Sequence, residues 1–355
     1  MNGSGATPSL MRREIGEVPA AVERVLAAAP NELAPVARAI RDRRPRWAMI
    51  AARGTSDHAA VYAQYLIEAH LGLPTSLAKP SITTVYGAPL DWRDGMLIAI
   101  SQSGQSPDIV GVVEVARAAD AVTVAITNEH PSPLAAAAEW HVGCHAGREL
   151  AIPATKTYVA ELAVVASLVA AVRGDASLTD GLAALPAVLD DTLRRSERWL
   201  DADGREALDD LANADRALLV SRGFNLATAL ELALKLKETC GLFAEAYSTA
   251  DFAHGPLVLA QSAVPAIGIR PDGPMGRLVD ETVAAVAGRG RRATVIGGSE
   301  AGAIPGALSL SSRLPEALTP LQFVVPGQLL VEAAARARGL SPDAPSGLGK
   351  VTLTR

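Results

Sequence analysis

The sequence has few of the features that mark several large classes of protein. Cys144 and Cys240 are its only cysteines, too few for a disulfide framework and too far apart for a clustered zinc site, so we expect buried, inert thiols. No apolar run reaches the roughly 18 residues that a membrane span needs, and the first residues lack the layout of a signal peptide. We therefore expect a cytoplasmic protein.

The sequence also has no basic stripe. The net charge is −5 at pH 7, and aromatic residues make up 4% of the chain, so nothing supports a nucleic-acid surface. No pair of histidines is expected to bind a metal from one helix face. His141 and His145 are four residues apart, but Gly143 lies between them and we expect the segment to be irregular. We therefore expect no metal, no cofactor, no nucleic acid and no membrane, and a small molecule as the partner.

What is present is a pattern of alternating strands and helices. Hydrophobic residues make up 49% of the 355 residues, a length that suits two domains. Strand-like runs at Trp47–Ala52, Met96–Ile100 and Val122–Thr127 alternate with helix-like runs at Asp57–Ala69 and Asp108–Ala118. This alternation predicts an α/β protein with a doubly wound parallel sheet.

The pattern then repeats. Arg53-Gly54 recurs as Arg222-Gly223, and Leu97–Ile100 recurs as Ala266–Ile269, both at an offset of 169 residues (222 − 53 and 269 − 100). A shared offset predicts a duplicated domain. We expect an N-terminal helical segment at 1–30, a first domain at 31–200, a second at 201–340 and an irregular tail at 341–355.

Further segments have helical periodicity, and the Gly/Ser-rich residues 1–7 are predicted to be disordered. The remaining helices are expected at Met11–Ala29, Leu162–Val172, Leu178–Trp199, Leu226–Thr239 and Leu329–Arg338.

Two hydroxyl-rich loops follow strands of the first repeat. In residues 101–106, Ser-Gln-Ser-Gly-Gln-Ser, backbone N–H groups at a helix N-terminus and three hydroxyls suit a phosphate. Residues 53–56 follow a neighbouring strand, and such loops converge on one crevice. Ordinary turns and helix caps remain the alternative for both loops. The absence of a Walker lysine favours a sugar phosphate over a nucleoside triphosphate.

Two segments of the second repeat carry acid/base groups. Glu231, Lys235 and Glu238 share one helix face, whereas Lys237 lies away from it. Apolar neighbours suggest a buried face, where a carboxylate beside a lysine is a tuned general base, although an exposed salt-bridge stripe is the commoner pattern. His254 precedes Gly-Pro in a rigid turn and is either an acid/base group or structural.

Together these motifs resemble the SIS (sugar isomerase) superfamily, specifically the isomerase domain of glucosamine-6-phosphate synthase and its stand-alone relatives. The resemblance spans nearly the whole chain and implies two tandem SIS domains, each a flavodoxin-like doubly wound parallel sheet flanked by helices. It is carried by residues 54–56, 101–104, 154–156, 233–238, 244–247, 254–257 and 347–350.

The resemblance also implies a role for each candidate residue. Glu238 would move a proton between carbons 1 and 2, His254 would open the sugar ring from the neighbouring subunit of a homodimer, and Lys350 would form a Schiff base. The supporting residues are Ser56, Ser101, Gln102, Ser103 and Ser106 for the phosphate, Thr55, Ile152 and Ala154 for the sugar, and Glu231 and Lys235 as polar support.

Departures from the synthases indicate the reaction. Synthases begin with a glutaminase domain and its N-terminal cysteine, whereas position 2 is Asn here, so we expect no built-in ammonia donor and a reaction that releases ammonia. Residues 52–60 are similar to stand-alone deaminases. The prediction is a glucosamine-6-phosphate deaminase (isomerising) that forms fructose 6-phosphate. The alternatives are a fructosyl-amine 6-phosphate deglycase, a galactosamine-6-phosphate deaminase/isomerase, or a non-catalytic sugar-phosphate sensor.

The tail departs as well. The synthases carry Asn-Leu-Ala-Lys-Ser where this chain has Gly-Leu-Gly-Lys-Val at residues 347–351. The Schiff-base role of Lys350 is therefore less firmly implied than the proton-transfer role of Glu238.

Overall fold

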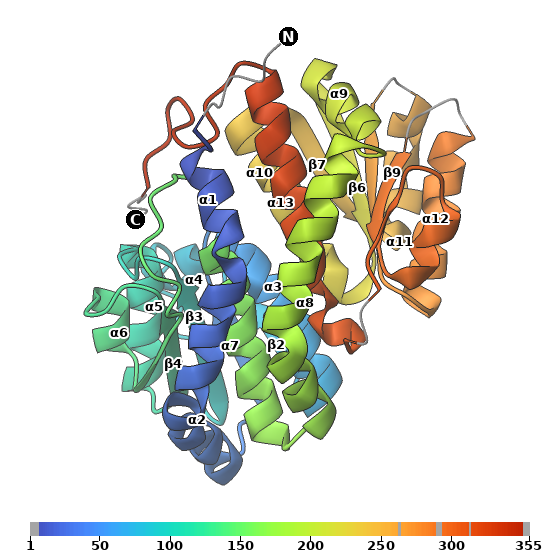
Figure 1. The fold of residues 1–355 in the computed structure, drawn as a ribbon. Coiled ribbons are helices and arrows are strands. Elements are labelled where there is room, and N and C mark those ends of the chain that lie inside the picture. Colours follow the sequence, from blue (N-terminus) through green and yellow to red (C-terminus); the bar gives the residue numbers. More distant parts are fainter. Residues whose placement is uncertain (1–6, 262–263, 289–292, 312–313, 351–355) are drawn as a thin grey trace.

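The molecule contains two parallel five-stranded sheets (Figure 1). The computed structural model describes residues 7–261, 264–288, 293–311 and 314–350, so most of the predicted disordered start and the last five tail residues lie outside the described residues. The first sheet contains β1 (Trp47–Ala51), β2 (Thr75–Leu77), β3 (Gly95–Ser101), β4 (Val122–Thr127) and β5 (Trp140–Gly143). The second contains β6 (Arg216–Ser221), β7 (Phe243–Ser248), β8 (Ala266–Arg270), β9 (Ala293–Gly297) and β10 (Leu308–Ser309).

Both sheets have the same topology. The first has the order β2-β1-β3-β4-β5, and the second, β10-β9-β8-β6-β7, is the same order when its strands are renumbered from β6 and read from the other edge. This is the flavodoxin-like doubly wound order. The predicted α/β class and the duplication are confirmed. β3 and β4 are apolar along nearly their whole length because a parallel sheet is covered on both faces.

Helices cover the sheets and fill the space between them. In Figure 1, α8 and α13 run through the middle of the molecule, between the two sheets, and α10 packs against both α3 and α13. The helices are α1 (Leu10–Gly16), α2 (Val18–Arg43), α3 (Thr55–Leu71), α4 (Pro80–Thr84), α5 (Pro107–Ala118), α6 (Pro133–Ala137), α7 (Lys156–Arg173), α8 (Ala176–Asp201), α9 (Arg205–Asn213), α10 (Leu226–Cys240), α11 (Thr249–Ala253), α12 (Pro274–Ala287) and α13 (Thr319–Ala337).

Prolines account for the main errors in helix prediction. The helix expected at Met11–Ala29 is two helices, and α2 continues through Pro30 and Pro35 to Arg43. Its later turns bury an apolar face, and α2 packs on α7, which outweighs the lost backbone hydrogen bonds. Likewise α13 begins ten residues before the predicted start and contains Pro326.

Three smaller expectations have an outcome in the structure. Cys144 and Cys240 are buried and free, and burial raises the pKa of both thiols, as expected of unreactive cysteines. His141 lies within β5, which ends at Gly143, so the irregular segment expected between His141 and His145 begins only after Gly143. Within the ranges that the structure describes, no helix combines the length and apolar character that a membrane crossing requires.

Candidate functional site

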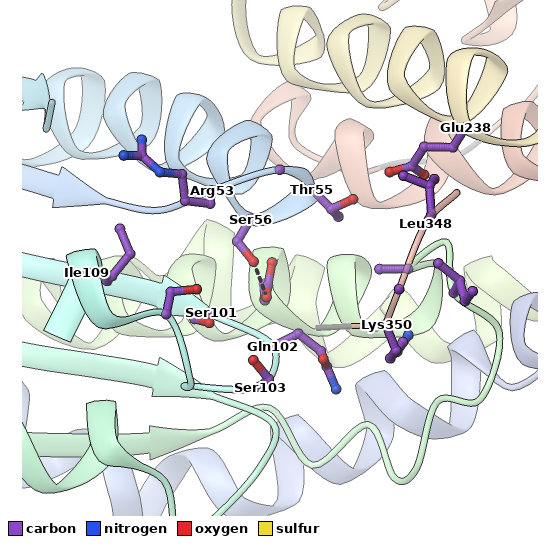
Figure 2. A pocket seen from close by; sticks show the side chains of 16 residues that line it. Arg53, Thr55, Ser56, Ser101, Gln102, Ser103, Ile109, Glu238, Leu348 and Lys350 are labelled. Atoms are coloured by element: carbon purple, nitrogen blue, oxygen red, sulfur yellow. Dashed lines mark hydrogen bonds between the residues drawn. The ribbon is translucent and has the colours of Figure 1, made fainter. Parts of the chain in front are cut away.

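A cavity of about 370 Å³ lies beyond the carboxyl ends of β1 and β3. Figure 2 shows Ser101, Gln102 and Ser103 on one side of it, with Glu238 and Leu348 across from them. The cavity brings together ten of the predicted site residues, namely Thr55, Ser56, Ser101, Gln102, Ser103, Ser106, Ile152, Ala154, Glu238 and Lys350.

The loop after β3 is held in one conformation by its own side chains. Ser101 Oγ accepts a hydrogen bond from the Gly104 amide at 3.1 Å. Gly104 has φ +62°, and a Cβ there would lie 2.4 Å from Ser132 Oγ, so only glycine fits without displacing its neighbours. Ser106 occupies the N-cap of α5, but its side chain makes no capping hydrogen bond. Its hydroxyl is therefore not committed to the helix, contrary to the capping alternative.

The predicted polar face of α10 reaches into the first lobe. The Lys235 ammonium donates a hydrogen bond to Thr55 Oγ1 at 2.9 Å and lies 3.4 Å from Glu231 Oε1. Thr55 Oγ1 in turn donates to Glu231 at 3.2 Å. Lys235 and Glu231 are fully buried, whereas the side chain of Lys237 is 45% exposed. The exposed-stripe interpretation of this face was wrong.

Glu238 is the carboxylate that opens onto the cavity. Its Oε2 lies 2.5 Å from the Lys235 ammonium. Burial lowers the pKa of Lys235, but the carboxylates of Glu231 and Glu238 outweigh this effect, so its pKa is raised and it remains a cation. A carboxylate held by a cation on one side and open on the other can accept a proton from a bound molecule.

Lys350 is held at the edge of the cavity by a buried acid. Its ammonium donates to Glu149 Oε2 at 2.9 Å and to the Ala151 carbonyl at 2.7 Å. Glu149 is itself fixed by the Thr155 amide at 2.9 Å and the Thr157 hydroxyl at 2.6 Å. The carboxylate of Glu149 therefore both positions and neutralises the lysine.

The tail that carries Lys350 is anchored by the first helix. The Asp343 carboxylate accepts hydrogen bonds from the backbone amides of Leu10 and Met11, both at 2.9 Å. The Asp343 carbonyl accepts one from the Ile152 amide at 2.8 Å. The tail is thus held between α1 and the loop that lines the cavity, and Figure 1 shows it passing beside α1.

His254 is the predicted residue that the structure places elsewhere. It follows α11, is exposed, and does not belong to the described residues that line the cavity. Its predicted role at the site of a neighbouring subunit stays a prediction.

Sequence reasoning missed several groups. Glu149 anchors Lys350, and His58 Nδ1 lies 2.8 Å from Glu231 Oε2. Glu161 lines the cavity and accepts a hydrogen bond from Ser56 Oγ at 2.8 Å. Burial raises the pKa of Glu161 to about 8. A signal for Glu161 was available, because it is the only charged residue in the largely apolar run at 157–172.

The described residues contain no group of three or more His, Cys, Asp or Glu side chains arranged to hold a metal ion. The polar and charged side chains that line the cavity are the hydroxyls, the Gln102 amide, the Arg53 guanidinium, the carboxyl groups of Glu161 and Glu238, and the Lys350 ammonium.

Comparisons with known proteins give the chain a family context. A family model described as the SIS domain matches residues 43–171 and 210–307. A glutamine–fructose-6-phosphate aminotransferase (isomerizing) of Methanothermobacter thermautotrophicus is 33% identical over 99% of this chain, and that of Pyrococcus horikoshii is 31% identical over 99%. The chain spans 58% of the length of each of these relatives.

Solved structures share the fold. A protein of Silicibacter pomeroyi DSS-3, proposed to be a phosphosugar isomerase, superposes with a TM-score of 0.85 at 37% identity, covering 95% of this chain and all of that one. A glucosamine-6-phosphate deaminase of Thermotoga maritima superposes with a TM-score of 0.75 at 22% identity, covering 98% of this chain and all of that one. The second likeness concerns the fold alone.

Proposed function

This chain belongs to the SIS domain family, and from that premise we propose that it is a sugar-phosphate enzyme that converts glucosamine 6-phosphate and water into fructose 6-phosphate and ammonia. The observation that carries the proposal is that Glu238 and Lys350 share one cavity with a hydroxyl-rich loop. The cavity volume, about 370 Å³, lies in the usual small-molecule range of roughly 300–1,000 Å³.

The phosphate group would bind at the loop after β3. Ser101, Ser103 and Ser106 line this end of the cavity together with Ser56, and the loop leads into α5 at Pro107. Hydroxyl donors and the positive end of a helix are a favourable environment for a phosphate. The sugar would then extend toward α10, where the carboxylate of Glu238 lies.

Proton transfer would be the work of Glu238. After ring opening, its carboxylate takes the proton from carbon 2 of the amino sugar and delivers it to carbon 1. A second proton passes from the amino nitrogen to the oxygen of carbon 1, which leaves an imine at carbon 2 and a hydroxyl at carbon 1. Water adds to that imine and ammonia leaves, giving the ketose. The Lys235 ammonium, 2.5 Å from Glu238, holds the carboxylate in place before the transfer.

Lys350 would assist through its amino group. To attack a carbonyl it must first lose a proton, and the carboxylate of Glu149 at 2.9 Å is placed to accept it. An iminium that Lys350 formed with the sugar carbonyl, with loss of water, would acidify the neighbouring carbon more than the carbonyl does, and hydrolysis would later release the lysine.

Ring opening would use His254 of a second copy of the chain. The residue is exposed and ends the short helix α11, where a homodimer could present it to the partner's cavity. An imidazole titrates near neutral pH, as an acid/base group for ring opening requires.

The names of the relatives support the choice of sugar phosphate but not the direction of the reaction. The Methanothermobacter relative is named for an aminotransferase acting on fructose 6-phosphate, the ketose product proposed here. A deglycase, a galactosamine-6-phosphate enzyme and a non-catalytic sensor remain outcomes of the experiment. Glu238, which is paired with Lys235 and opens onto a ligand-sized cavity, favours an enzyme, because a sensor needs no acid/base group at that position.

The test follows ammonia and fructose 6-phosphate while the purified protein is incubated with glucosamine 6-phosphate. Glu238→Gln should lower kcat by about 10²–10⁴-fold while fructose 6-phosphate still binds. Glu245→Gln is the matched control, since Glu245 is an exposed acid of β7, and it should leave kcat unchanged. Consumption of a fructosyl-amine 6-phosphate without any turnover of glucosamine 6-phosphate would favour the deglycase, and binding without turnover of either would favour the sensor.

The shared site has its own test. Mixing Glu238→Gln and His254→Ala subunits should restore part of the activity, because half of the cavities in a heterodimer would combine an intact Glu238 with an intact His254. Proven heterodimers without recovery would place both residues in the site of a single chain.

A further inference from the structure

Glu161 is a buried acid in the floor of the proposed phosphate pocket. It lies on α7, is 1% exposed and lines the cavity. Its Oε1 accepts the hydrogen bond from Ser56 Oγ at 2.8 Å, which is dashed in Figure 2. Its Oε2 is buried and has no hydrogen-bond partner among the described residues. A buried carboxyl oxygen without a partner is costly unless the group is neutral or meets a ligand.

The neighbours of Glu161 favour its neutral form. After burial, the carboxylates of Glu149 and Glu231 are the next influences that raise its pKa, and the bond from Ser56 acts in the opposite direction. The cations near the cavity are paired with other groups. Lys235 is bound to Thr55 and Glu238, Lys350 to Glu149, and Arg53, which also lines the cavity, to Asp108. The other titratable groups coupled to Glu161 are Cys144, which follows β5, and Tyr158 on α7, both without charge at neutral pH.

We propose that Glu161 is a phosphate-binding residue that must carry a proton when the pocket is filled. This inference rests on the proposed function, because it takes the ligand to be a sugar phosphate. When ionised, Glu161 holds the Ser56 hydroxyl proton and places a negative charge beside a dianion. When protonated, it either donates to Ser56, which frees the Ser56 hydroxyl for the ligand, or offers its own Oε2 proton to a phosphate oxygen.

This arrangement links binding to pH. Glu161 has a pKa of about 8 in the free protein, so binding is strong below that pH and is lost as the pH rises through it. A ligand that requires the proton should bind about tenfold more weakly at pH 9 than at pH 7. The phosphate itself, with a second pKa of about 6, hardly changes its charge over this range. Glu161→Gln donates through its amide at every pH, so its affinity should not change between pH 7 and pH 9.

The experiment is calorimetric titration with fructose 6-phosphate at pH 7, 8 and 9. The wild-type dissociation constant should rise about tenfold over this range, and that of Glu161→Gln should stay flat. Ser106→Ala is the matched control, because it lines the same pocket without the Glu161 bond; it should weaken binding at every pH and keep the wild-type slope. Equal slopes in wild type and Glu161→Gln would overturn the proposal.

A second measurement needs no variant. Titrations of the wild type near pH 8.5, in two buffers with different heats of ionisation, report proton uptake directly. The expected uptake is between about one half and one proton for each ligand bound. No uptake would overturn the proposal even if Glu161→Gln failed to fold.

The binding and activity measurements together test the role of Glu161 separately from the proposed reaction. Proton-linked binding of fructose 6-phosphate without ammonia release from glucosamine 6-phosphate would reject the deaminase and retain the role of Glu161. Ammonia release together with pH-independent binding would do the opposite. If fructose 6-phosphate does not bind at all, inorganic phosphate is titrated in the same way: proton-linked binding supports the role of Glu161, and its absence rejects it.

Discussion

The two lobes have the same strand order but use the same place in the sheet differently. In the first lobe, β3 ends in a loop of small hydroxyl residues, and the cavity beside it measures about 370 Å³. In the second lobe, β8 ends at Arg270, and the pocket beside the following loop, lined by Asp272 and Gly298, measures about 70 Å³. Both lobes have a pocket beyond the carboxyl ends of their strands, and the side chains around it determine its volume.

Arg270 forms a network of ion pairs at the end of β8. Its side chain is 4% exposed and donates two hydrogen bonds to the Asp280 carboxylate and one to Glu300, all at 2.9 Å, with Asp272 at 3.4 Å. The floor of the first lobe has the opposite arrangement, because Glu161 is a buried acid without an adjacent cation. In the second lobe the buried charge of Arg270 is compensated by carboxylates, whereas in the first lobe Glu161 Oε2 has no hydrogen-bond partner among the described residues.

The largest expected effect on stability comes from the unpaired acid. The pKa of Glu161 is raised to about 8 in the folded chain, so stability falls as the pH rises from the unfolded pKa, about 4.3, to about 8. Glu161→Gln removes this penalty. Urea unfolding should show little difference from wild type at pH 4 and a gain of up to about 5 kcal/mol at pH 9. A constant difference at both pH values would mean that Glu161 does not titrate in this range.

The converse change in the second lobe should destabilise it. Arg270→Met leaves three carboxylates without their shared cation, and we expect a loss of about 2–3 kcal/mol in the free energy of unfolding. Arg277→Met, at an exposed position of α12, is the control and should change stability by less than about 0.5 kcal/mol. Fructose 6-phosphate affinity should be unchanged in folded Arg270→Met, and a clear loss of affinity would show that the second crevice supports the first.

The smallest effect concerns the glycines of the two loops. Gly104 and Gly273 both have positive φ, +62° and +80°, but only at Gly104 would a Cβ meet a neighbour. Alanine should cost about 1 kcal/mol at Gly273 from backbone strain, and about 1 kcal/mol more at Gly104 from the clash with Ser132. Thermal unfolding of both variants measures this difference. Equal losses of stability in the two variants would mean that the loop at Gly104 rearranges to accommodate the Cβ without further cost.

Local patterns explain what the sequence could predict. The shared helix face of Glu231, Lys235 and Glu238 follows from their spacing in a short segment. The duplication follows from the shared offset of 169 residues. The apolar strands of both sheets follow from the same kind of reasoning. These features led to the fold and to seven of the ten predicted residues that line the cavity, whereas Ile152, Ala154 and Lys350 were predicted from the family resemblance.

The contacts that the sequence could not predict join distant segments. Glu149 and Lys350 are 201 positions apart, and His58 and Glu231 are 173 apart, so no local spacing brings them together. Helix ends were misjudged at Pro30 and Pro326 because burial of an apolar face overrides the local preference of proline.

The contact between Asp343 and α1 is intramolecular, so the tail can dissociate from α1 and bind again without leaving the protein. Because it is covalently attached, the segment 341–350 rebinds its groove at a high effective concentration, even if each individual contact is weak. The amides of Leu10 and Met11 contribute to the lifetime of that bound state. Loosening α1 should therefore raise the rate at which the tail leaves, carrying Lys350 away from the cavity and exposing whatever the cavity holds to water.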